Sequence, residues 1–213
     1  MRAFERSATI ALLGTDGEAG LALEGLFTPG AEPALAGAVI APPHPLYGGS
    51  MDSPVVTELA HACAAAGLTS LRFNWRGVGA SAGESSGDFA VADGDVRSAL
   101  AFMEESLEEP LVACGYSFGA AAVLRASQGW VRVRRLLLVA PPPSILDADA
   151  LCAFPGDILI VAGEVDPIAP ADALESLAVE LPRAQLVAIP GSDHFFMSGL
   201  TALHQAAAGW LAR

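Results

Sequence analysis

The sequence Gly-Tyr-Ser-Phe-Gly at residues 115–119 constrains the fold of this chain more than any other stretch. It follows the apolar run 111–114, which is typical of a buried strand, and it precedes the alanine-rich run 120–126, which favours a helix. A Gly-x-Ser-x-Gly turn between a strand and a helix presents its serine at the tip of a sharp bend, a nucleophile elbow. The glycines avoid collisions with neighbouring elements. Ser117 is therefore a candidate nucleophile; the alternative is a tight turn without chemistry.

Further apolar runs along the chain indicate buried strands that alternate with helices. Two runs at 7–14 and 20–28 lie on either side of a turn-like stretch at 15–18. They predict an antiparallel hairpin that precedes the other strands. Strands that alternate with helices predict an α/β fold with a mostly parallel sheet, and we expect a single domain over 1–213. The strands are expected at 37–41, 68–73, 111–114, 134–140, 157–162 and 185–189, and the helices at 54–67, 88–107, 120–126, 171–181 and 200–211.

Composition excludes several classes of function. The 213 residues are 53% hydrophobic and 16% charged, with a formal net charge of −13, so we expect neither nucleic-acid binding nor attachment to anionic membranes. No apolar run approaches the length of a membrane span, and no signal peptide is evident, which makes a cytoplasmic location the expectation. Cys63, Cys114 and Cys152 fit neither a disulfide framework nor a zinc site, and small buried thiols are expected.

The polar residues that could act with Ser117 all follow predicted strands. In a parallel sheet the carboxyl ends of the strands meet at one edge, so residues that follow different strands can face one crevice. His44-Pro45-Leu46, Arg76-Gly77, Asp166 and His194 each follow a strand in this way.

His194 is the candidate general base, because a neutral imidazole can accept the serine proton and return it to a leaving group. His61 and His204 fall within predicted helices, where a solvated or packed role is expected. An acid must hold the other imidazole nitrogen, and Asp166 is placed for this. Glu164 and Asp193 are rivals for that role. The order serine, acid, histidine is the one that α/β-hydrolases use.

An acyl-transfer intermediate also needs backbone N–H donors for its oxyanion. The Phe118 N–H, at the start of the helix after Ser117, is one candidate. The loop after residue 41 should supply the second. Pro45 has no N–H, so Leu46 is preferred and Tyr47 is next. The alternative is a proline-rich connection with no part in catalysis.

Four segments resemble the small lidless bacterial serine hydrolases of the α/β-hydrolase superfamily, relatives of dienelactone hydrolase. They are 43–52 (PHPLYGGSMD), 73–81 (FNWRGVGAS), 115–119 (GYSFG) and 190–196 (PGSDHFF). The resemblance covers nearly the whole chain. It implies an eight-stranded, mostly parallel sheet whose second strand is antiparallel, and a triad of Ser117, Asp166 and His194. Dienelactone hydrolases use a cysteine nucleophile, where this chain has serine.

The expected function is hydrolysis of small carboxylic esters through an acyl-enzyme, without metal or cofactor. Thioesterase, lactonase and peptidase activities on the same triad are alternatives, and a non-catalytic binding module is another. The stretch 141–154 is too short for a helical cap, which predicts an open site suited to short-chain esters. Tyr47, Phe195 and Phe196 are expected either to line an acyl pocket or to pack. The loop 76–81 is expected to support the fold rather than bind phosphate.

Overall fold

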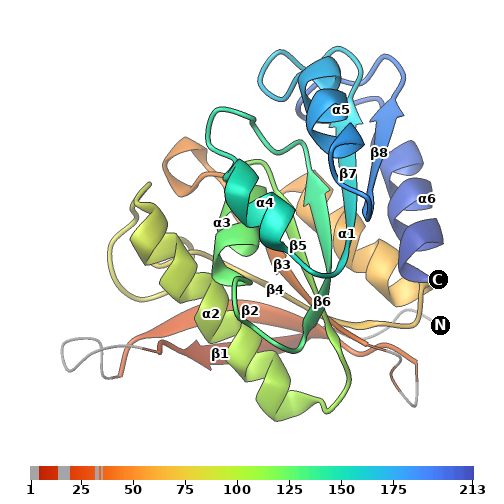
Figure 1. The fold of residues 1–213 in the computed structure, drawn as a ribbon. Helices are drawn as coiled ribbons and strands as arrows, with labels where there is room; N and C mark the ends of the chain where they lie inside the picture. The colour runs from red at the N-terminus through yellow and green to blue at the C-terminus, as the bar shows by residue number, and fades with distance from the viewer. Residues whose placement is uncertain (1–4, 14–19, 32–33, 35) are drawn as a thin grey trace.

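An eight-stranded sheet forms the centre of the computed structural model, which describes residues 5–13, 20–31, 34 and 36–213 (Figure 1). The strand order is β1-β2-β4-β3-β5-β6-β7-β8. β2 is antiparallel to both neighbours and the remaining pairs are parallel, which confirms the predicted α/β-hydrolase architecture. The strands are β1 (Arg6–Ala11), β2 (Ala22–Thr28), β3 (Gly37–Ala41), β4 (Thr69–Phe73), β5 (Leu111–Tyr116), β6 (Val133–Val139), β7 (Asp157–Gly163) and β8 (Ala184–Ile189).

The helices cover both faces of this sheet. α1 and α6 pack against each other, with α1 on β3 and β4 and α6 on β7 and β8, whereas α2 and α3 pack together and cover β3 and β5. The Ala120–Ala122 run of α3 is fully buried, because small side chains let the helix lie close to the sheet. The helices are α1 (Pro54–Ala65), α2 (Phe89–Ser106), α3 (Phe118–Ala126), α4 (Ala148–Ala153), α5 (Ala171–Val179), α6 (Leu200–Leu211) and the short 3-10 helix η1 (Pro45–Tyr47).

Most predicted boundaries are confirmed within two residues. The hairpin of β1 and β2 is present, while its predicted turn at 15–18 lies outside the described residues. β6 ends one residue early because Ala140 adopts a φ of 44°, which is incompatible with a strand. Only α4 occupies the stretch 141–154, so no cap covers the sheet there. Cys63 and Cys114 are buried as expected, but Cys152 is exposed on α4.

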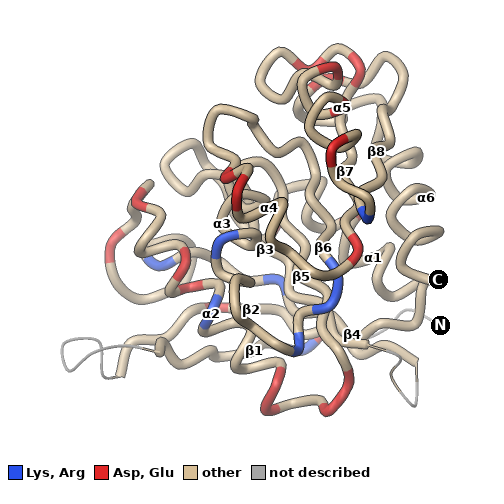
Figure 2. The backbone as a smooth tube through the Cα atoms, viewed as in Figure 1, with Lys and Arg blue, Asp and Glu red and all other residues tan. Residues whose placement is uncertain are grey.

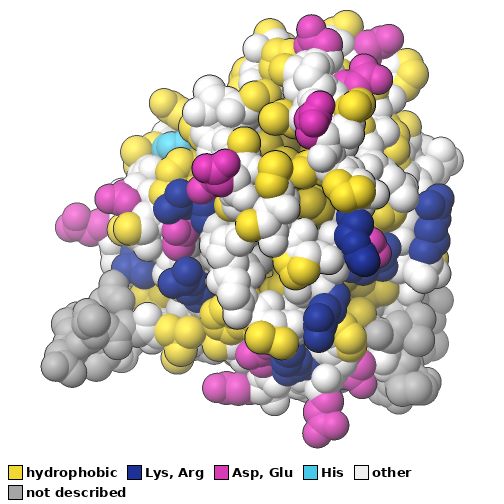
Figure 3. Space-filling model, in the orientation of Figure 1, with side chains coloured by type: hydrophobic (Ala, Val, Ile, Leu, Met, Phe, Trp, Pro, Cys, Tyr) yellow, Lys and Arg dark blue, Asp and Glu magenta, His cyan; other side chains and the backbone are white. Residues whose placement is uncertain are grey.

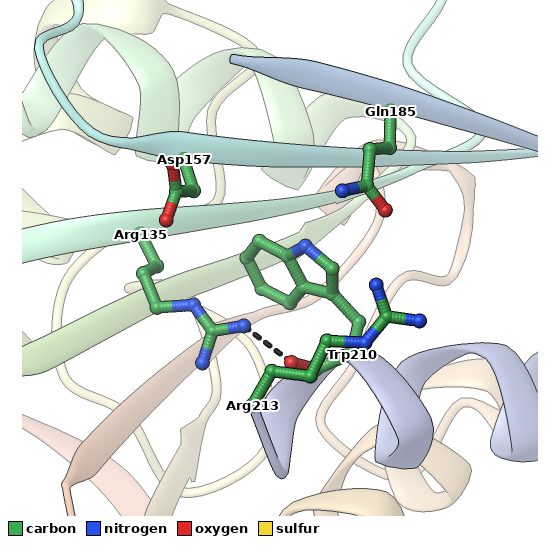
Figure 4. A pocket seen from close by; sticks show the side chains of 5 residues that line it. All are labelled: Arg135, Asp157, Gln185, Trp210 and Arg213. Carbon is green, nitrogen blue, oxygen red and sulfur yellow. Dashed lines mark hydrogen bonds between the residues drawn. The ribbon is translucent and has the colours of Figure 1, made fainter.

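Arginine side chains secure the amino-terminal end of the sheet. Arg135, at the start of β6, lies over the Trp210 ring at 3.8 Å from its centroid. Its guanidinium also donates to the backbone oxygens of Trp210 and Leu211, so it caps the carboxyl end of α6 (Figure 4). A shallow cavity of about 250 Å³ beside this contact is lined by Asp157, Gln185 and Arg213 as well. These contacts attach the last helix to the sheet.

Candidate active site

Ser117 occupies the sharp turn between β5 and α3. Its φ of 55° and ψ of −118° are unusual for a residue with a side chain, and they direct the hydroxyl away from both elements. A Cβ on Gly115 would lie 2.3 Å from the Gly119 oxygen, and one on Gly119 would lie 2.4 Å from the Pro42 oxygen. Glycine is therefore required on both sides of the serine, as the sequence pattern predicts.

The structure brings the side chains of Ser117, His194 and Asp166 together from three different strand ends. His194 Nε2 lies 3.0 Å from Ser117 Oγ, and His194 Nδ1 lies 2.7 Å from Asp166 Oδ2. The His194 and Asp166 side chains are almost entirely shielded from solvent. A carboxylate only accepts hydrogen bonds, so Nδ1 carries the proton and Nε2 is free to accept the serine hydroxyl.

Asp166 is held as an anion by its surroundings. Burial alone would raise the pKa of this carboxyl, but the hydrogen bonds from His194 and from two backbone N–H groups outweigh it and lower the pKa. Those N–H groups belong to Ile168 and Ala169, and they reach Asp166 Oδ1 at 2.8 and 2.9 Å. The carboxylate thus has partners on both oxygens.

The two rival acids have other partners. Glu164 Oε2 accepts the Gly191 N–H at 2.8 Å and is exposed. Asp193 Oδ1 accepts the Phe195 N–H at 3.1 Å. Of the three acids weighed from the sequence, the hydrogen bond to His194 is made by Asp166.

Tyr116, which the sequence did not single out, anchors the histidine loop. Its hydroxyl donates to the His194 backbone oxygen at 3.0 Å. Burial, with the charges of Asp166 and Asp193, raises the pKa of this phenol well above its usual value, so it stays a neutral donor. Tyr116 lies at the end of a strand, directly before the serine. No sequence pattern at that position predicts a contact with the histidine loop.

In the loop after β3, the structure differs from the prediction that the Leu46 N–H is an oxyanion donor. The Leu46 N–H donates to His44 Nδ1 at 3.2 Å, so the predicted oxyanion donor already has a partner inside its own turn. Among the hydrogen bonds of the described residues, none is donated by the His44 N–H. Residues 42, 43 and 45 are prolines and have no backbone N–H, so within 42–45 only His44 can donate. This pattern could have been recognised in the sequence.

The His44 ring is fixed in this position by its neighbours. Its centroid lies 4.6 Å from both the Tyr47 and the Phe118 rings. Burial lowers the pKa of His44, and the neutral ring is the form whose Nδ1 can accept the Leu46 N–H. The Trp75 indole donates to the Pro43 oxygen at 2.9 Å and holds the loop from the other side. The loop backbone is thereby set against the start of α3.

A pocket of about 640 Å³ opens beside Ser117, between the loops that follow the strands. Tyr47 and Phe195 line it, as predicted. Phe196 does not, and its prediction as a pocket residue is wrong. Its φ of 54° turns the ring in the opposite direction from that of Phe195, into the core, where it is fully buried. Sequence reasoning also missed four apolar lining residues, namely Val55 of α1, Ile145 and Ile168 in the loops after β6 and β7, and Met197 in the loop after β8.

The glycine-rich loop after β4 serves the fold. Arg76 Nε donates to the buried Asp95 at 2.7 Å, and the Arg76 N–H donates to the other oxygen of the same carboxylate. Gly77 and Gly79 have φ of 73° and 59°, which permit the tight turn. These contacts agree with the predicted supporting role.

Two searches of the described residues concern other classes of protein. No cluster of three or more His, Cys, Asp or Glu side chains within them is arranged to hold a metal ion. Nor does any helix in the described part of the chain have the length and apolar character needed to cross a membrane.

The sequence of this chain is similar to those of known proteins. A family model described as serine aminopeptidase, S33, matches residues 46–151. The uncharacterized protein RP471 of Rickettsia prowazekii is 31% identical over 189 residues, which cover 82% of this chain and 77% of that protein.

Two solved structures share the fold over nearly their whole length. XC6422 from Xanthomonas campestris, an α/β serine hydrolase without a lid, has a TM-score of 0.82 at 27% identity, covering 98% of this chain and 94% of that one. ATU1826 of Agrobacterium tumefaciens, a protein of unknown function, has a TM-score of 0.86 at 27% identity, covering 98% and 95%. The chain belongs to the α/β-hydrolase superfamily and resembles its lidless serine hydrolases.

Proposed function

We propose that this protein is a serine hydrolase that cleaves carboxylic esters through an acyl-enzyme. The observation that carries the proposal is the continuous hydrogen-bond chain from Ser117 through His194 to Asp166. Each link has the length expected of a nucleophile, a base and an orienting acid. We also propose a cytoplasmic location, because the buried Cys63 and Cys114 are free thiols.

In the first half of the proposed reaction, Ser117 Oγ attacks the ester carbonyl while its proton moves to His194 Nε2. The imidazolium that results is stabilised by the Asp166 carboxylate. The bond to the alcohol oxygen then breaks, and His194 returns the proton to that oxygen. In the second half, His194 takes a proton from water, the hydroxide attacks the acyl-enzyme, and Ser117 is released with its hydrogen restored.

We assign the oxyanion contacts to the Phe118 and His44 N–H groups. Phe118 is the first residue of α3, where the N–H has no partner within the helix and the helix dipole favours negative charge. His44 is favoured over Leu46 because the Leu46 N–H is directed at the His44 imidazole. Donors fixed before the reaction stabilise the developing charge without reorganisation.

Labelling with a fluorophosphonate tests the proposal. The native protein should be labelled on Ser117 and Ser117→Ala should not, and the native protein should release alcohol from p-nitrophenyl esters in a burst. Labelling that persists in Ser117→Ala, or hydrolysis that is unaffected by this change, would contradict the assignment. The turnover of thioester and anilide analogues with the same acyl group would then be compared with ester turnover. This comparison tests the thioesterase and peptidase alternatives.

The name of the matching family makes an aminopeptidase the second candidate. An aminopeptidase must hold the positively charged α-amino group of its substrate, which requires a carboxylate or several carbonyl groups nearby. No Asp or Glu is among the described residues that line the pocket. We therefore expect esters of amino acids with a free α-amino group to be hydrolysed at least about 100-fold more slowly than the N-acetylated esters with the same leaving group, because an unpaired buried charge is costly.

A further inference from the structure

Among the described residues, those that line the pocket beside Ser117 include no arginine, aspartate or glutamate as a charged partner for a substrate. Its lining comes from five loops and is mainly aliphatic, aromatic and proline side chains. The polar groups are serine hydroxyls, tyrosine hydroxyls and the imidazoles of His44 and His194. Neither arginine nor a carboxylate lines the pocket within the described residues. A charged acyl group placed there would lose its water without gaining a counter-ion.

The surroundings of the pocket are acidic. All eleven basic residues of the chain are arginine, and of these only Arg76 lies in the loops that follow β3 to β8, where it is bonded to Asp95. Figure 2 shows red acidic segments and no blue ones in the uppermost part of the molecule. The acidic residues of these loops, apart from Asp166, are Asp52, Glu84, Asp88, Asp147, Glu164 and Asp193.

Large hydrophobic side chains surround the opening of the same pocket. Four of them, from η1 and from the loops after β7 and β8, line the pocket and are each at least 48% exposed. Figure 3 shows hydrophobic and acidic side chains, without basic ones, over the top of the face in view. The four, which we call the rim, are Tyr47, Ile168, Phe195 and Met197.

From these three observations we infer that the substrate, if the chain is the serine hydrolase proposed above, is an ester whose acyl group is uncharged, apolar and larger than acetyl, and that acyl groups bearing a carboxylate are excluded. A volume of about 640 Å³ lies within the range of sites that take whole drug-sized ligands, well beyond a short-chain ester. Burial of an unpaired carboxylate opposes binding, and the acidic loops repel it on approach.

The acidic loops also assist release of the acid product. They repel the carboxylate that hydrolysis creates once it leaves the oxyanion donors. The rim extends the apolar surface beyond the pocket, which accommodates acyl chains longer than the cavity itself.

The test compares methyl 4-methylpentanoate with monomethyl succinate, in which a carboxylate replaces the isopropyl group, and with methyl succinamate, which is polar but neutral. We expect kcat/KM for monomethyl succinate to be at least about 100-fold below that for the methylpentanoate and also below that for the succinamate. Equal values for the charged and branched esters would overturn the inference. Failure of all three esters together with failure of fluorophosphonate labelling would instead contradict the proposed hydrolase function.

A positive charge added to the pocket provides the second measurement. Ile145→Arg should raise the ratio of monomethyl succinate to methylpentanoate turnover at least about tenfold, and Ile145→Gln should not. Val131→Arg adds the same charge at an exposed residue between α3 and β6, at the opposite end of the sheet, and should leave the ratio unchanged. An unchanged ratio in Ile145→Arg would count against a charge-based exclusion.

The rim is tested with a series of methyl esters from acetate to octanoate below their aggregation limits. Each methylene removed from water should raise kcat/KM by up to about fourfold until the apolar surface ends. Tyr47→Ser combined with Met197→Ser should flatten the upper part of the series. Val179→Ser, a change to an exposed valine on α5 outside the rim, should leave its slope unchanged. A flat series in the native protein would overturn the predicted preference for large acyl groups.

Discussion

The two ends of the central sheet differ in the charge and in the contacts of their side chains. At the amino end, arginines donate to backbone oxygens and so tie helices to the sheet. Arg132 reaches the oxygens of Leu107 and Glu109 at the end of α2, and Arg135 caps α6. At the carboxyl end, the loops are acidic, apolar side chains are exposed, and the polar groups converge on Ser117. One end consists of contacts that hold the fold together, and the other presents groups for chemistry.

Backbone strain follows the same division. Among the described residues, the non-glycine residues with positive φ are Ser117, Ala140 and Phe196. They follow β5, β6 and β8, so all lie at the carboxyl end. Such conformations cost roughly 1 to 3 kcal/mol each and persist only where the surrounding structure fixes them. This fold therefore stabilises one end of the sheet with hydrogen bonds from arginine side chains. Its strained turns lie at the other end, where the candidate site is found.

The largest expected effect comes from the orienting acid. Asp166→Asn should lower kcat by about 10⁴-fold, because an amide no longer fixes the His194 tautomer or stabilises the imidazolium. Glu164 is the first residue after β7 and its carboxylate accepts the Gly191 N–H, so Glu164→Gln should change kcat by less than about tenfold. Steady-state rates with one ester measure both. A larger loss of kcat in Glu164→Gln than in Asp166→Asn would instead assign the orienting role to Glu164.

A methyl group at the elbow should damage activity and stability together. Gly119→Ala places a Cβ 2.4 and 2.5 Å from the Pro42 and Ala41 oxygens, so the oxyanion loop and α3 must separate. We expect kcat/KM to fall at least about 100-fold and the free energy of unfolding to fall by about 1 to 3 kcal/mol. Gly209→Ala in α6, where a Cβ meets nothing within 4 Å, is the control and should stabilise the protein by up to about 1 kcal/mol. Normal ester turnover in Gly119→Ala would contradict the close approach.

At the amino end, Arg135→Ala should affect stability without affecting chemistry. Loss of the cap on α6 and of the contact with Trp210 should lower the free energy of unfolding by about 1 to 3 kcal/mol, measured by urea denaturation. Turnover of esters should stay within about twofold of the native rate. Arg134→Ala, at the exposed neighbouring residue, should change stability by less than about 0.5 kcal/mol. A large loss of activity in Arg135→Ala would break the division between the two ends.

The smallest expected effect is the pH dependence of stability that arises from Asp166. Its folded pKa is lowered, so the stability it contributes is complete above its unfolded pKa and is lost as the pH falls through the folded value. The difference in unfolding free energy between the native protein and Asp166→Asn should therefore be constant above about pH 5 and shrink below it. A difference that grows with acidification would reverse the sign assigned to this carboxyl.

The fold and the order of the polar groups along it could be predicted from local sequence patterns. Apolar runs of strand length alternate with helices in this chain, and a parallel sheet then brings every strand's carboxyl end to one edge. Ser117, Asp166 and His194 follow three such strands, so their meeting could be predicted without coordinates. The glycines at 115 and 119 could likewise be predicted, because the sharp turn leaves no space for a Cβ.

The directions of individual backbone and side-chain groups, in contrast, depend on tertiary contacts. The His44 ring accepts the Leu46 N–H, which removes the donor that the proline pattern favoured. The positive φ at Phe196 sends its ring into the core while the adjacent Phe195 remains at the rim. The pocket's lack of charge depends on which faces of five separate loops meet around it. Strand periodicity is a local property, whereas these directions follow from contacts between segments far apart in the sequence.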